Sequence, residues 1–307
     1  MRQRGGRVRR RRGRVPFGLA LLLAVIAGLV AARRIVGAPE AQALISVDTC
    51  RSAIEVDADA DWVDPRWADE LALLLAELPA FPADDRAGVL AVADEVATLP
   101  FVAEVFEPRV VWPDGVELDV RLRRPAACVW IGESFYAIAE DGVVLPGSYP
   151  APPWIGHGYL PVIGPNDRSF DEFLAGDALV EERHLDALSV AISMRAAFSA
   201  DVFEVMGPPL IDATRARLTS VREPGVIIDL EGARRVWFGR APWSDEPGEL
   251  PVRMKWDSLA RAVAELARGT DWDRLDVRWD DPDVRLRDAQ TASGDPAAWT
   301  TWHLREG

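Results

Sequence analysis

The sequence predicts an α+β protein with a single N-terminal transmembrane helix, a compact β-α-α-β-β unit, and a β-rich domain with flanking helices. Three observations lead to this fold class. An uncharged apolar run lies near the N-terminus, two helical patterns precede a well-marked hairpin, and later segments alternate β-rich runs with turns. The 307 residues leave room for two modest domains, each with its own core.

The composition describes a globular and strongly acidic protein. Hydrophobic residues make up 49% of the chain and charged residues 27%. The net charge is −14, although the basic tip, residues 1–14, contributes eight Arg and no acidic residue. The rest of the chain is therefore even more acidic than the whole. Because such a surface repels polyanions, we expect no nucleic-acid partner, and only the basic tip is suited to anionic lipid.

Residues 15–32 form the apolar run and contain no charge. A helix of this length extends about 27 Å, close to the thickness of a hydrocarbon core. Since the Arg-rich tip precedes it, we expect a cytoplasmic N-terminus, one span of the cytoplasmic (inner) membrane, and extracytoplasmic C-terminal domains. A cleaved signal peptide is the alternative. Its cleavage site, Ala41-Gln42-Ala43, lies well beyond the run, which favours a retained anchor.

The region after the anchor predicts a small mixed unit. Residues 43–60 show the β-branched alternation of a first strand. Asp64-Pro65 supplies an N-cap and a proline at the first helical position. A second helix is expected at 84–98, followed by two β-rich runs that flank a turn at 112–115. Pro125 ends the second run and separates this unit from the next domain.

The second domain contains recognisable elements near its end. Residues 225–239 read as two strands joined at Glu231-Gly232, and a helix follows at 252–268 with Gly269 as its stop. Two more strands are expected within 274–288. The tail, residues 289–307, has no period and is expected to be disordered, with two tryptophans as a short binding motif.

This ordered series resembles the POTRA domain and following β domain of the FtsQ/DivIB family of bacterial cell-division proteins. The matching segments are Leu99-Pro100-Phe101-Val102, Trp112-Pro113, Arg123-Arg124-Pro125, Tyr159 to Gly164, and Arg274 to Asp288. The resemblance implies six regions: a basic cytoplasmic tip (1–14), a transmembrane helix (15–32), a linker (33–44), a POTRA-like domain (45–124), an FtsQ-like β domain (125–288) and a disordered tail (289–307).

The resemblance also implies a function. A non-catalytic bitopic membrane scaffold of the division machinery would bind FtsB-like and FtsL-like single-span proteins by strand addition at a sheet edge. For Arg278 the residues alone also allow a structural role, a salt bridge to Asp276 or Asp280. The partner-binding positions implied by the resemblance are Arg222, Arg278, Trp279, Asp283, Val284, Arg285, Leu286 and Arg287.

Catalytic, cofactor-binding and metal-binding residues are not expected. His157, His184 and His303 are scattered, without Cys or Glu at ligand spacing, and favour surface or capping roles. The two cysteines, Cys50 and Cys128, form a disulfide or remain two buried thiols. Two other function classes stay open: an anchored or secreted extracytoplasmic enzyme, and a POTRA-bearing export component.

Overall fold

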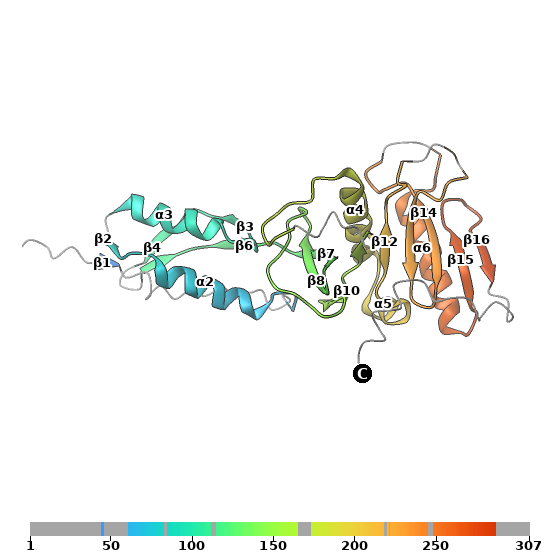
Figure 1. Ribbon diagram of the computed structural model, residues 1–307, viewed down its shortest axis with the longest axis horizontal. Coiled ribbons are helices and arrows are strands. Elements are labelled where there is room, and N and C mark those ends of the chain that lie inside the picture. Colours follow the sequence, from blue (N-terminus) through green and yellow to red (C-terminus); the bar gives the residue numbers. More distant parts are fainter. Residues whose placement is uncertain are drawn as a thin grey trace, which may run out of the picture.

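The computed structural model describes residues 44–45, 61–82, 85–111, 115–164, 173–217, 220, 222–244 and 248–286. Figure 1 shows two parts joined end to end: a narrow part with helices α2 (Pro65–Glu77) and α3 (Arg86–Ala97), and a broader part built on a large sheet. The apolar run at 15–32, most of the expected first strand and the C-terminal tail lie outside the described residues.

The narrow part contains two helices and three short strand pairs. Helix α2 starts after Asp64, whose carboxylate accepts the backbone N–H of Arg66 as predicted, with proline at the first helical position. The elements of the narrow part are α2 (Pro65–Glu77), α3 (Arg86–Ala97), β1 (Leu44–Ile45) paired with β2 (Phe81–Pro82), β3 (Val102–Val105) with β6 (Val120–Leu122), and β4 (Arg109–Val111) with β5 (Gly115–Glu117).

The broad part is an eight-stranded sheet in the order β16-β15-β14-β13-β12-β11-β7-β8. A small antiparallel pair, β9 with β10, lies beside it. The strands are β7 (Pro125–Ile131), β8 (Ser134–Ala139), β9 (Trp154–Ile155), β10 (Gly158–Tyr159), β11 (Val162–Ile163), β12 (Leu210–Asp212), β13 (Val226–Leu230), β14 (Arg234–Gly239), β15 (Trp272–Asp276) and β16 (Asp283–Leu286).

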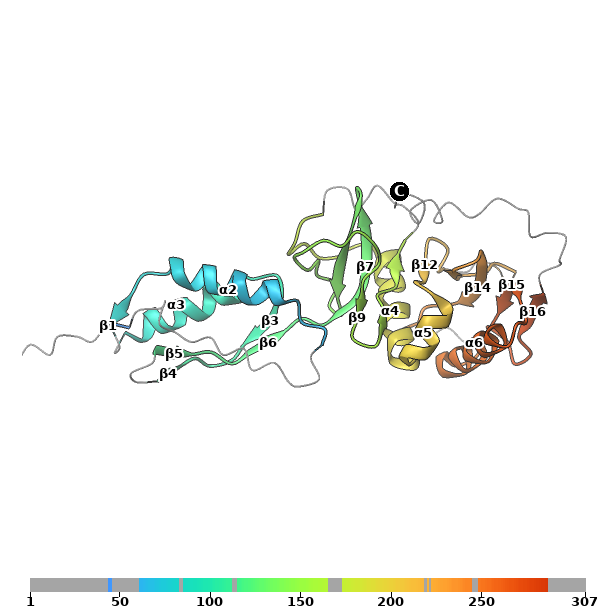
Figure 2. The ribbon, with the colours of Figure 1, turned by 90° about the horizontal axis from the view of Figure 1, so that it is seen from below.

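Three strand pairs in this sheet are parallel: β7 with β11, β11 with β12, and β14 with β15. Parallel neighbours need a crossover connection. Helices α4 (Glu182–Ala197) and α5 (Ala200–Met206) supply it between β11 and β12, and α6 (Val252–Ala267) supplies it between β14 and β15. Figure 2 shows these three helices together on one side of strands β12 to β16.

The predicted fold class is therefore wrong. The structure is mixed α/β, with five helices among the described residues and one large sheet that combines parallel and antiparallel strands. The strands of the expected POTRA-like β-α-α-β-β unit form separate two-stranded pairs. No helix in the described ranges is long and apolar enough to cross a membrane. Alternating patterns identified strands but not their direction, because crossover pairing depends on contacts between distant segments.

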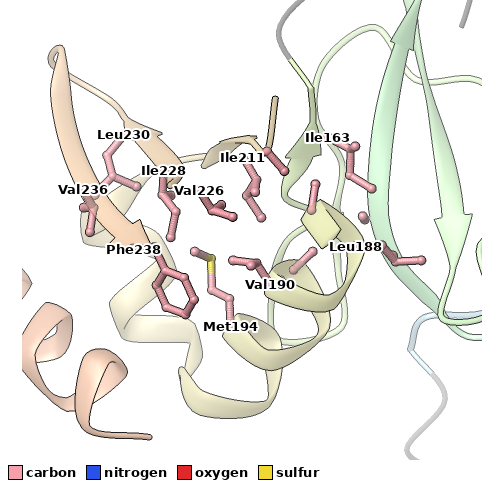
Figure 3. Close-up of a cluster of buried hydrophobic side chains, with 14 of the residues drawn as sticks. Ile163, Leu188, Val190, Met194, Ile211, Val226, Ile228, Leu230, Val236 and Phe238 are labelled. Carbon is pink, nitrogen blue, oxygen red and sulfur yellow. The ribbon is translucent and has the colours of Figure 1, made fainter. Parts of the chain in front are cut away.

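The main core lies between the sheet and its helices. In Figure 3, Val190 and Met194 of α4 point toward Ile211, Val226 and Phe238 on the strands. All five side chains are fully buried. Burial of this apolar surface is the dominant source of stability for the broad part.

A second core joins the two parts. It begins at Trp67 of α2, which stacks on Phe101 with ring centroids 5.3 Å apart, and continues to Cys128, Ala137 and Leu160 in the broad part. The expected boundary between residues 124 and 125 thus falls within a continuous core. Pro125 is the first residue of β7, where a strand tolerates the missing donor.

Cys128 is a free thiol with no exposed surface, and its Sγ donates a hydrogen bond to the Leu160 carbonyl at 3.5 Å. Burial raises the pKa of this thiol. The unfolded chain loses this proton near pH 9 while the folded chain keeps it, so stability falls as pH rises above that value.

The buried thiol should lower the free energy of unfolding at pH 10 relative to pH 8. In reducing buffer, we expect Cys128→Ala to reduce this difference between the two pH values by about 1 kcal/mol. Urea titrations of both proteins at the two pH values measure it. An unchanged difference would mean that the thiol reaches solvent in the folded state.

Candidate partner-binding edge

Strand β16 forms one end of the large sheet, at the end of the molecule farthest from α2 and α3 (Figure 1). It pairs antiparallel with β15, and Asp276 lies opposite Asp283 at the start of the pairing. All four residues of β16 are exposed. A strand carries backbone N–H and C=O groups along both of its edges. No described strand pairs with the edge of β16 that faces away from β15, so this outer row of backbone groups is open to a further strand.

The two faces of β16 differ in character. Val284 lies opposite the fully buried Leu275, so it points to the helix-covered face, where it is 41% exposed. Leu286 shares that face and is 58% exposed. Asp283 and Arg285 occupy the other face. The edge therefore combines an apolar side and a charged side.

Ion pairs anchor the charged side to β15. Asp283 accepts a hydrogen bond from Arg274 at 3.1 Å, and Arg285 binds both carboxylate oxygens of Asp273 at 2.6 Å. A bidentate arginine–carboxylate pair fixes orientation better than a single contact does. The strand is thus held in a defined position although its outer row is open.

Arg278 lies in the turn after β15 and is 2% exposed. Its guanidinium binds the Asp276 carboxylate at 2.7–2.9 Å and donates to the Glu223 carbonyl. It also stacks over the rings of Trp237 and Trp279 at 5.5 and 5.4 Å. The structure thus favours the structural role, a salt bridge to Asp276, and leaves this side chain no surface to offer a partner. Trp279 remains 36% exposed.

The other predicted positions are distributed more widely. Arg222 is exposed and its backbone N–H donates to Ser220 Oγ at 3.2 Å, one residue before the carbonyl that Arg278 binds. Arg287 and Cys50 lie outside the described residues. Cys128 is on β7, near the opposite end of the sheet from β16.

The opposite end of the sheet is β8, which is covered. Phe135 and Ile138 form bridges to Tyr149 and Val144 from the segment that follows β8. The Tyr149 N–H donates to the Phe135 carbonyl at 2.9 Å, and the Phe135 N–H donates to the Tyr149 carbonyl at 2.8 Å. Of the two ends of the sheet in the described chain, β16 is the one that offers an open backbone row.

Sequence reasoning missed a buried ion pair that supports this edge. Lys255 of α6 is 2% exposed, and its Nζ lies 2.6 Å from Glu249 Oε2. Glu249 also accepts the backbone N–H of Arg240. The next residue, Leu250, donates its N–H to the carbonyl of Arg278 at 2.9 Å and so ties this segment to the β15–β16 turn. The single lysine in an arginine-rich chain was the available signal.

Two of the three histidines, His157 and His184, lie among the described residues. His157 Nε2 lies 2.8 Å from the Arg195 carbonyl, and His184 is 3% exposed on α4, so the expected surface role of His184 is wrong. His303 lies outside the described residues. Within the described ranges, no three His, Cys, Asp or Glu side chains gather in a metal-binding arrangement.

Comparison with known proteins adds no relative to this picture. No family model matches the chain, and no curated protein matches it either.

Proposed function

We propose that this chain is a non-catalytic scaffold that binds an extended segment of another protein by strand addition at β16. The observation that carries the proposal is the open outer row of β16, held by Arg274 and Asp273 at the free end of an eight-stranded sheet. An incoming strand satisfies these backbone groups, and the exposed side chains of Val284 and Leu286 supply selectivity.

The resemblance of the sequence to the FtsQ/DivIB family supports the division machinery as the setting. In that setting the partners are FtsB-like and FtsL-like single-span proteins. Their contacts lie along residues 283–286 and the exposed ring of Trp279. Arg278 contributes through the turn that it stabilises.

Proline substitution tests the mechanism, because it removes a backbone donor. The N–H groups of consecutive strand residues point in opposite directions, so one of Val284→Pro and Arg285→Pro removes an outward donor. We expect that variant to lose at least about tenfold in affinity, the free energy of one or two main-chain hydrogen bonds. Val284→Thr keeps the donor and the branched shape, and it is expected to bind like the parent protein.

The measurement is co-purification of each full-length variant with a tagged FtsB-like single-span protein encoded by the same genome. Circular dichroism verifies folding. If both proline variants stay folded and still retain this partner, binding does not use the β16 edge, and the proposal is wrong.

A further inference from the structure

Strand β16 has a charge pattern that is complementary to itself. Its charged face carries Asp283 and Arg285, whose side chains are 67% and 58% exposed despite their ion pairs with β15. Its apolar face carries Val284 and Leu286. Val284 thus has an acidic residue before it and a basic residue after it. Two antiparallel copies of such a strand can place each acidic residue opposite a basic residue of the other copy.

Symmetry restricts how two copies of this edge can meet. In an antiparallel pair related by a two-fold axis perpendicular to the sheet, directly opposite residues point to the same face. A register centred on Val284 places Asp283 of each copy opposite Arg285 of the other, and Val284 opposite Val284 across the axis. A register centred on Arg285 would place two guanidinium groups opposite each other, which is unfavourable.

We propose that β16 pairs with β16 of a second copy of this chain, in the register centred on Val284, and joins two sheets into one. The inference rests on the proposed role of β16 as a strand acceptor and names an occupant for it. The two new Asp283–Arg285 contacts extend the ion pairs that each residue already makes with Arg274 and Asp273. The axis buries the apolar surface of Val284, now 41% exposed.

The pairing has a functional consequence. The second copy and an extended partner segment compete for one backbone row, so the dimer is a closed form of the edge and partner binding opens it. A four-residue strand makes few main-chain bonds, which keeps this exchange readily reversible.

Cysteine cross-linking tests the register. In the full-length protein, Val284→Cys places two thiols opposite each other across the axis, within the spacing that a disulfide needs, whereas the thiols of Leu286→Cys lie several residues apart. On a non-reducing gel after mild oxidation, we expect at least about tenfold more disulfide-linked dimer for Val284→Cys, because only this variant meets disulfide geometry. Leu286 is the more exposed residue, so random collision would favour the control. The parent protein gives the background from Cys50 and Cys128.

Charge exchange tests the ion pairs independently. Asp283→Arg alone and Arg285→Asp alone each place like charges opposite each other across the dimer. We expect both single variants to lose the dimer in cross-linking on the Val284→Cys background. Mixing the two single variants restores opposite charges in both contacts and should restore the cross-link, which misfolded proteins would not do. Circular dichroism checks each variant.

These experiments use the purified chain without a partner, so their failure is separate from failure of the proposed function. Equal cross-linking of the two cysteine variants, or no recovery in the mixture, overturns the self-pairing. If the FtsB-like protein still binds and a proline variant abolishes that binding, the scaffold proposal stands on its own.

Discussion

Lys255→Met is expected to lower the free energy of unfolding by about 3–5 kcal/mol, because it leaves the carboxylate of Glu249 buried without its counter-ion. The ammonium and carboxylate are 2.6 Å apart, with side chains 2% and 7% exposed. The ammonium also lies 4.7 Å above the ring of Phe238. Burial lowers the pKa of Lys255, although its partner opposes the shift.

Urea titration monitored by circular dichroism measures the loss. Arg253→Met is the matched control, since Arg253 is exposed on the same helix and its replacement should change stability by less than about 0.5 kcal/mol. The double variant Lys255→Met with Glu249→Gln removes both charges and keeps an acceptor for the Arg240 N–H. It should regain most of the loss. A single-variant loss below about 1 kcal/mol would show that water reaches this pair.

Trp67→Ala is expected to cost about 3–5 kcal/mol, the range for removing a large aromatic side chain from a core. Trp67 is 2% exposed, stacks on Phe101, and donates its indole N–H to the Pro146 carbonyl at 3.4 Å. The cavity would open where the narrow and broad parts meet. Leu73→Ala is the control on the same helix, because Leu73 is 68% exposed and contributes little to the core.

Hydrogen exchange of the backbone amides gives a second measure of this change. If the core is continuous, Trp67→Ala should also weaken protection on β7 and β8, which carry Cys128 and Ala137 of the same cluster. Loss of protection confined to α2 and α3 would mean that the two parts open independently.

Local signals allowed α2, α3 and α6 to be predicted from the sequence. The Asp64 cap and Pro65 place the start of α2, and Gly269, with φ of 93°, lies one residue after the C-cap of α6. The hairpin turn at Glu231-Gly232 was also predicted from the sequence, and in the structure it joins β13 and β14. Each of these features depends on residues close together in the sequence.

Long-range features were not predictable in the same way. The buried state of Arg278 depends on Glu223 and Trp237, which belong to other segments. Arg195 is a similar case: it sits 8% exposed on α4 and donates to carbonyls of Ile155, Gly158 and Tyr159. Burial lowers its pKa to about 10. An arginine in an acidic sequence looks like a surface residue until its distant partners are known.

The burial of Lys255 has a consequence for the chemical reactivity of the protein. It is the only lysine in the sequence, so the folded chain has no freely accessible side-chain amine. Reagents that acylate amines would leave the amine of Lys255 unmodified while α6 stays packed. Acylation at Lys255 would occur only in molecules in which α6 has detached. The rate of this acylation would therefore report how often α6 opens.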